Sequence, residues 1–164
     1  MVASIDKGLD PRDIQAIYVG CFSGDQFEAQ GHMGPVVADW AGLVPIPSTR
    51  VEGACAAGSL AIREGMLAIA SGLYDIVLVS GVEKMSALST ERVQDALATA
   101  SDALYEAAVG FTCPSLYASM ATAHMARHGT TEEELMKVAI KNHNNGALNP
   151  KAQFHVSIRD IMAQ

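Results

Sequence analysis

The sequence has few positive charges. Its 164 residues contain 11 Lys and Arg against 18 Asp and Glu, which gives a formal net charge of −7. The basic residues form no cluster, so the charge argues against a protein that binds nucleic acid or a membrane surface through bulk electrostatics. The sequence also lacks an apolar run long enough for a transmembrane helix, because Arg63, Glu64 and Asp75 interrupt its longest apolar region.

Cysteine is scarce as well. The three cysteines, Cys21, Cys55 and Cys113, lie far apart and form no C-x-x-C pair. The N-terminus does not show the charged and then apolar pattern of a secretory signal. These absences favour a reduced, intracellular location, and we expect the cytoplasm.

The histidines do not form an evident metal site. His124 and His128 lie one turn apart on a predicted helix, a spacing that can suit a metal. No glutamate follows His124 in the metalloprotease arrangement, and no third ligand is evident. We therefore expect solvated histidines and no bound metal.

The composition is that of a globular protein. Hydrophobic residues make up 49% of the chain and the mean hydropathy is +0.18, which argues against a disordered chain. The length suffices for one domain with an adequate core. No internal repeat, low-complexity run or interdomain linker is visible in the sequence.

One stretch, Val51 to Ser86, organises the rest of the chain. It has the pattern of a strand end, a cysteine at a tight turn, a long helix and a second strand. A thiol at a helix N-terminus faces unpaired N–H groups and the positive end of the helix dipole, and both favour the nucleophilic thiolate. Small neighbours let the chain turn sharply and let another molecule approach the sulfur of Cys55. These neighbours are Gly53, Ala54, Ala56, Ala57 and Gly58.

The helix after Cys55 is apolar nearly all round, which is typical of a buried helix. Glycine inside a helix costs roughly 1 kcal/mol relative to alanine, so we expect close packing to offset that cost. One face carries small residues at steps of three and four: Ala54, Gly58, Ala61, Gly65, Ala68 and Gly72. The neighbouring face carries Ile62, Met66, Ile69 and Leu73.

The remaining elements follow from hydrophobic spacing and from helix caps. Residues 88–104 have the pattern of a surface loop with a helical turn or two. Two overlapping capping boxes, Thr130 with Glu133 and Thr131 with Glu134, predict a further helix that ends near residue 145. Strands are expected over 14–22, 49–52 and 76–79, and helices over 31–42 and 116–128.

The spacing alone leaves two interpretations of Cys55. The first is a nucleophile at a strand-to-helix turn, with sulfur in the place that serine oxygen takes in the nucleophile elbow of hydrolases. The second is a buried structural thiol in an α/β core, the commonest fate of a free cysteine.

The motifs around Cys55 resemble those of a known family. The chain contains V-E-G-A-C-A-A-G-S-L-A-I-R and D-I-V-L-V-S-G-V-E-K-M-S, which are similar to the nucleophile segment of thiolases, particularly the sterol-carrier-protein type and its archaeal and bacterial relatives. Residues 31–43 resemble the helix that precedes the nucleophile strand. Residues 141–154, with N-H-N-N-G, L-N-P and A-Q-F, resemble part of the thiolase loop domain. The resemblance covers nearly the whole chain.

This resemblance implies an α/β fold, namely the N-terminal half of the thiolase fold in mixed βαβ layers, plus a mostly helical loop domain. Residues 1–90 would form the core that carries the nucleophile, and residues 91–164 would form the loop (lid) domain. We expect about half of an enzyme, either because the sequence is truncated or because another polypeptide supplies the rest.

The resemblance also implies acyl transfer between CoA thioesters, by Claisen condensation of acetyl-CoA or by thiolytic cleavage of a 3-oxoacyl-CoA. Cys55 would carry the acyl group, with CoA thioesters as substrates and no cofactor. In thiolases a histidine and a second cysteine come from the C-terminal half, and this sequence has no G-H-P or C-x-G segment of that kind. The alternative is a non-catalytic acyl-CoA-binding or assembly subunit that needs a partner chain for activity.

Further binding residues are implied in the same way. Phe111, Cys113 and Pro114 would line the pantetheine and acyl-chain tunnel. The alternative, which their pattern alone favours, is a plain loop-to-helix junction. His143 would shape the mouth of the CoA site. A homodimer or tetramer would form through the Thr49–Glu52 strand region.

Overall fold

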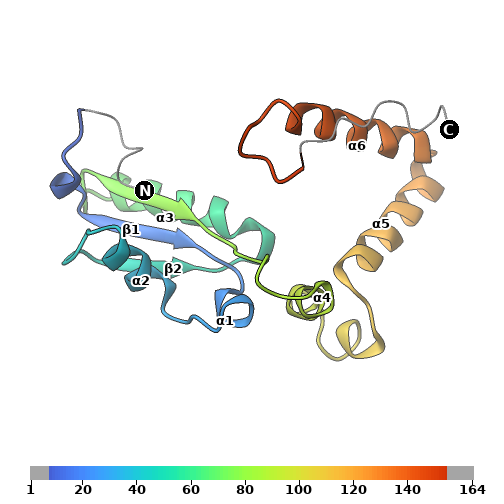
Figure 1. The fold of residues 1–164 in the computed structure, drawn as a ribbon, viewed down its shortest axis with the longest axis horizontal. Helices are drawn as coiled ribbons and strands as arrows, with labels where there is room; N and C mark the ends of the chain where they lie inside the picture. The colour runs from blue at the N-terminus through green and yellow to red at the C-terminus, as the bar shows by residue number, and fades with distance from the viewer. Residues whose placement is uncertain (1–7, 155–164) are drawn as a thin grey trace. The chain divides into compact units, whose positions relative to one another are not determined.

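The computed structural model describes residues 8–154 (Figure 1). The chain divides into two compact units that meet between Cys113 and Pro114. The first unit is built of strands and helices, and the second contains helices, which confirms the predicted α/β class with a mostly helical remainder. The predicted division of the chain into 1–90 and 91–164 stays a prediction.

A three-stranded parallel sheet lies at the centre of the first unit. Its strands are β1 (Ala16–Gly20), β2 (Ser48–Val51) and β3 (Val77–Gly81), in the order β2-β1-β3. Tyr18 of the central strand lies opposite Thr49 on one side and Val79 on the other. The three strands predicted from sequence are therefore confirmed, with ends that differ by one or two residues.

Two helices cover the sheet, α2 (Met33–Trp40) and α3 (Ala57–Ala70). Both follow a strand and lead to a parallel one, as parallel pairing requires. Side chains alternate across a strand, so neighbouring residues of β1 face opposite layers. Ile17 and Val19 are fully buried in a cluster with residues of α2, while Tyr18 lies on the side of α3. That cluster consists of Ile14, Ile17, Val19, Cys21, Met33, Ala38 and Leu43.

The buried face of α3 consists only of small residues. A Cβ atom on Gly65 would lie 2.8 Å from Val79 Cγ2 and 3.3 Å from Val77 Cγ2. At the other end of the contact, a Cβ atom on Gly20 of β1 would lie 2.6 Å from the carbonyl oxygen of Ala57. The buried face is formed by Ala57, Ala61, Gly65 and Ala68. The helix backbone thus lies almost directly on the sheet.

The opposite face of α3 is exposed. Ile62, Met66 and Ile69 are 54%, 67% and 46% accessible to solvent. The sequence predicted that the helix after Cys55 is buried nearly all round. Within the described residues 8–154 this prediction is wrong, because only one face of α3 is buried. The apolar pattern showed which side chains favour burial, but it could not show that only the small-residue face meets the sheet.

The segment after β3 is more helical than expected. Helix α4 (Thr90–Ala98) begins at Ser89, whose hydroxyl accepts a hydrogen bond from the Arg92 N–H, and its Ala96 is buried. The short elements of the first unit are η2 (Pro11–Asp13), α1 (Gly24–Phe27), η3 (Ala54–Ala56) and η4 (Ala107–Val109).

The second unit contains α5, which begins at the junction (Cys113–His128), and α6 (Glu132–Gly146). Helix α5 begins three residues earlier than predicted, because proline is tolerated in the first turn of a helix. Of the two predicted capping boxes, Thr131 with Glu134 is the one that caps α6. Across residues 8–154, no helix combines the length and apolarity needed to cross a membrane.

The close contact of α3 with the sheet predicts a difference between two glycines of this helix. Gly65→Leu should lower the free energy of unfolding by on the order of 1–3 kcal/mol, because its side chain must displace Val77 and Val79. Gly58→Leu is the matched control, since a Cβ atom there meets no other atom within 4 Å. Urea denaturation followed by circular dichroism measures both. Equal stability of the two variants would show that α3 does not rest on the sheet through Gly65.

Candidate active site

The carboxyl ends of the three parallel strands meet at one edge of the sheet, the usual position for a ligand site in an open α/β sheet. A cleft of about 350 Å³ lies at this edge. Most of its lining is apolar or glycine, and it holds one thiol. The lining residues are Gly20, Phe22, Ala54, Cys55, Ala57, Gly58, Gly81, Val82, Glu83, Met85 and Leu97.

Cys55 reaches this cleft through a sharp turn after β2. Ala54 takes a left-handed conformation with φ of +47°, which is uncommon for a residue other than glycine. The Glu52 carboxylate accepts a hydrogen bond from the Ala54 N–H at 2.6 Å, which stabilises the turn. The 3₁₀ turn η3 (Ala54–Ala56) then carries Cys55 directly to the start of α3. Strain of this kind is often found at functional sites.

The surroundings of Cys55 suit attack on an apolar substrate. Cys55 is exposed. The N-cap residue of α3 is Ala56, whose side chain forms no hydrogen bond with the N–H groups of the first turn. Glu83 is the charged residue of the lining. Its carboxylate accepts hydrogen bonds from the N–H groups of Phe22 and Ser23. Among residues 8–154, the lining of this cleft includes no histidine that could act as a base.

Cys21 shows what a structural thiol looks like in the same unit. It follows β1 directly, is 1% exposed and belongs to the core cluster. Burial raises the pKa of the Cys21 thiol above its ordinary value, and its S–H donates to Glu83 Oε1 at 3.7 Å. The structure thus gives Cys21 a buried place and Cys55 an exposed one, and the nucleophilic role of Cys55 stays a prediction.

The other predicted binding residues are not in the lining of this cleft. Phe111 follows η4 and is 38% exposed, and Cys113 is the half-buried first residue of α5. Pro114 is exposed in the first turn of α5. His143 lies in the last turn of α6, where its ring centroid is 6.2 Å from that of Phe154. Their role in binding CoA stays a prediction.

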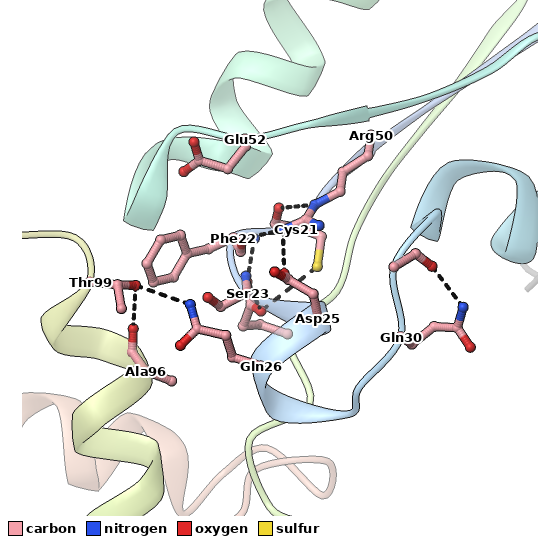
Figure 2. A network of polar contacts seen from close by, with 12 residues as sticks. Cys21, Phe22, Ser23, Asp25, Gln26, Gln30, Arg50, Glu52, Ala96 and Thr99 are labelled. Atoms are coloured by element: carbon pink, nitrogen blue, oxygen red, sulfur yellow. Dashed lines mark hydrogen bonds and ion pairs between the residues drawn. The ribbon is translucent and has the colours of Figure 1, made fainter.

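Two charged residues near the cleft were not singled out from the sequence. Arg50 of β2 and Glu83, which follows β3, both bind the backbone of residues 21–23 (Figure 2 shows Arg50 with this segment). Each lies near the carboxyl end of a strand, where polar side chains often serve a site. Their position at the strand ends could have marked them as candidates in the sequence. The segment that they both bind lies 28 to 62 residues away along the chain, so the sequence did not show that they act together.

A second, larger cleft of about 610 Å³ lies against α2. Trp40, Val36 and Met33 form part of its wall, and Lys84 forms an ion pair with Glu28 at its rim, at 3.6 Å. Its lining has no thiol, hydroxyl or imidazole group, and the amine of Lys84 is engaged in the ion pair with Glu28. Within residues 8–154, no three His, Cys, Asp or Glu side chains gather in a way that could hold a metal ion.

Comparison with known proteins gives a consistent result. Residues 3–163 match the family model described as the N-terminal domain of thiolase. The chain is 50% identical over 159 residues to an acetyl-CoA acetyltransferase of Methanothermobacter thermautotrophicus, covering 96% of this chain and 41% of the relative. It is 48% identical over 147 residues to an acetyl-CoA acetyltransferase of Methanocaldococcus jannaschii, and the match covers 90% of this chain and 37% of the relative. Sterol carrier protein 2 of Gallus gallus is 29% identical over 160 residues, and the match covers 93% of this chain and 28% of the relative.

These relatives are much longer than the region that matches. The chain spans 41% and 37% of the length of the two archaeal relatives. The resemblance noted in the sequence, to the archaeal and sterol-carrier-protein types and to the N-terminal part alone, is confirmed.

The different burial of the thiols predicts an order of reaction. Cys55 should be alkylated by iodoacetamide at neutral pH about tenfold or more faster than Cys21, because Cys21 is buried and its thiol has a raised pKa. Peptide mapping by mass spectrometry after a short exposure measures the order, and the urea-unfolded chain serves as control, since burial is lost there. Equal rates for the two cysteines in the folded chain would contradict the placement of Cys55 at an open turn.

Proposed function

The chain belongs to the thiolase family, and we propose that it serves thiolase-type acyl transfer between CoA thioesters through an S-acyl intermediate on Cys55. The observation that carries the proposal is the exposed Cys55 at the start of α3, in an apolar cleft at the carboxyl ends of three parallel strands. The archaeal relatives bear the name acetyl-CoA acetyltransferase, which supports acetyl-CoA as a substrate.

The first step forms a thioester on the protein. The Cys55 sulfur bonds to the carbonyl carbon of an acyl-CoA, the bond from that carbon to the CoA sulfur breaks, and CoA leaves and takes up a proton. In the condensing direction a carbanion formed from acetyl-CoA then attacks the Cys55 thioester. In the thiolytic direction the Cys55 sulfur instead bonds to the 3-carbonyl carbon of a 3-oxoacyl-CoA, the bond between C2 and C3 breaks, and acetyl-CoA leaves as a carbanion that takes up a proton. Free CoA then attacks the Cys55 thioester, and the bond from the acyl carbon to the Cys55 sulfur breaks. Nothing is oxidised or reduced, so no cofactor is needed.

The N–H groups at the start of α3 support this chemistry. A tetrahedral intermediate places negative charge on the carbonyl oxygen, and backbone N–H groups at a helix start can stabilise such a charge. The N–H of Cys55 itself would be one donor. Within residues 8–154 the lining of the cleft includes no histidine, and we propose that the base that forms the carbanion comes from a part of the protein other than this lining. The greater length of the relatives supports this division.

The surface of the first unit supports further association. Strand β2 pairs with β1 on one side and lies at an edge of the three-stranded sheet. We propose that the chain self-associates through the Thr49–Glu52 region, and that a partner surface covers the exposed apolar face of α3. We also expect a cytoplasmic location.

Self-association should be visible in sedimentation velocity. The purified chain should sediment as a dimer or larger species that dissociates on dilution, because an open strand edge and exposed Ile62, Met66 and Leu73 favour contact between copies. A monomer at every concentration tested would contradict the proposed interface.

The alternative function is a non-catalytic acyl-CoA-binding or assembly subunit. It shares the cleft and the fold with the first proposal, but it does not require a covalent bond to Cys55. Selective acylation of Cys55, over Cys21 and Cys113, therefore separates the two functions.

The purified 164-residue chain should accept a single acetyl group from acetyl-CoA, slowly and on Cys55, and should not turn over. The cleft supplies a nucleophile but no base, so acyl transfer to the protein is possible while sustained thiolysis of acetoacetyl-CoA is not. Intact-mass spectrometry follows the added acetyl group, and Cys55→Ser, which changes little volume, is the control that should keep the fold and lose the label. Acetylation on another cysteine, or sustained release of acetyl-CoA from acetoacetyl-CoA, would contradict this division of labour.

A further inference from the structure

The segment that follows β1, residues 21–23, is held from one side by Arg50 of β2. Arg50 Nε donates to the carbonyl oxygen of Cys21 at 2.9 Å, and its Nη2 donates to the carbonyl oxygen of Phe22 (Figure 2). The same Nη2 atom forms an ion pair with Asp25 at 3.1 Å. The guanidinium group therefore satisfies two consecutive carbonyl groups of the segment, and these are charge-assisted hydrogen bonds.

Glu83, which follows β3, binds the donors of the same segment. Its Oε2 accepts from the Phe22 N–H at 2.7 Å, and its Oε1 accepts from the Ser23 N–H at 3.0 Å. The Cys21 S–H donates to the same Oε1 at 3.7 Å. Both carboxylate oxygens are thus occupied by this segment, so Glu83 acts here as a fixed acceptor and not as a base.

This arrangement, which we call the 21–23 clamp, consists of Arg50, Glu83 and the segment between them. The clamp forms one wall of the cleft that holds Cys55, because both Phe22 and Glu83 line it. The clamped segment leads into α1, where Gln26 Nε2 donates to Thr99 Oγ1 at 3.3 Å (Figure 2). Thr99 is the C-cap of α4, the helix that contributes Leu97 to the same lining.

We propose that Glu83 is a positioning residue for the acyl step at Cys55. Its carboxylate fixes residues 21–23 so that the Phe22 side chain forms a firm wall against which the thioester is held near the sulfur. The proposal rests on the proposed function, since it assigns a role in acyl transfer. Glu83 gains and loses no proton in the step, and it forms no bond to substrate.

The physical reason is that attack on a thioester requires both reacting atoms to be held in place. A displacement of about 1 Å can cost on the order of a hundredfold in rate. Small reagents such as iodoacetamide do not need a wall, because they react with an exposed thiol from many directions. Loss of the clamp should therefore slow acetylation of Cys55 without slowing its alkylation.

Three variants of the full 164-residue chain separate the possibilities. Glu83→Gln keeps the size of the side chain but places an NH₂ group opposite a backbone N–H, so the clamp loses an acceptor. Phe22→Ala removes the wall and keeps the backbone groups that the clamp binds. Glu64→Gln is the matched control, because it makes the same chemical change in an ion pair with Arg63 on α3, outside the cleft lining.

Each variant is tested for acetylation of Cys55 by acetyl-CoA and for alkylation of Cys55 and Cys21 by iodoacetamide, with circular dichroism to verify the fold. Glu83→Gln and Phe22→Ala should both lower the ratio of acetylation to alkylation at Cys55 by about tenfold or more relative to Glu64→Gln. Only Glu83→Gln should also speed alkylation of Cys21, because that thiol belongs to the segment that Glu83 holds and donates to Glu83 Oε1.

An acetylation-to-alkylation ratio in Glu83→Gln equal to that in Glu64→Gln would overturn the proposal. The proposal would also be overturned if iodoacetamide alkylated Cys21 at the same rate in Glu83→Gln and in Glu64→Gln. If Glu83→Gln does not fold, Phe22→Ala decides, and an unchanged ratio in that variant overturns the proposal. A wild-type chain that is alkylated at Cys55 but never acetylated would refute the proposed function instead, and Cys21 alkylation would then still show whether the clamp exists.

Discussion

The first unit depends on a close contact between α3 and the sheet that only small residues permit. Gly65 lies against Val77 and Val79, and the first residue of the helix, Ala57, lies against Gly20 at the end of β1. A side chain on either glycine would lift the helix away from the strands. Because α3 begins at the carboxyl ends of the strands, the same contact fixes where the turn that carries Cys55 can lie. Packing and site are thus set by one constraint.

The contact also explains why α3 has an exposed apolar face. A helix that buries alanine and glycine removes little apolar area from water, so this contact contributes little hydrophobic stabilisation. It allows the helix backbone to lie close to the strands. The larger side chains, Ile62, Met66 and Ile69, remain on the outside. A helix with apolar residues on both faces is suited to lie between two layers. The sheet is one of these layers, and the exposed face is free to meet another.

Much of this fold could be predicted from the sequence, because its strands and helices have strong local signals. The continuous apolar run in 76–79 and the Thr131–Glu134 capping box need no distant partner to be recognised. The exposure of α3 could not be predicted in the same way, because apolar spacing shows a preference for burial but not which neighbour is present. Residues 88–104 were expected to be mostly loop because their pattern is polar and rich in alanine, yet Ser89 caps α4 there.

The candidate site was predictable only in part, for a related reason. Cys55 could be found because its small neighbours and its place between strand and helix are local features. The roles of Arg50 and Glu83 depend on backbone groups 28 to 61 residues away, and no local pattern connects those positions. The parallel sheet brings them together, since β2 and β3 flank β1, whose end continues into residues 21–23.

The two cysteines near the strand ends show how little separates a structural thiol from an accessible one. Cys21 directly follows β1, and its N–H still donates to the Val51 carbonyl at 3.1 Å, so it continues the pairing of the sheet and stays in the core. Cys55 lies four residues beyond the end of β2, after the turn at Ala54 has carried the chain out of the sheet. Burial raises the pKa of the Cys21 thiol and keeps it protonated. The turn at Ala54, which carries the chain out of the sheet, therefore leaves Cys55 exposed, whereas Cys21 stays in the core.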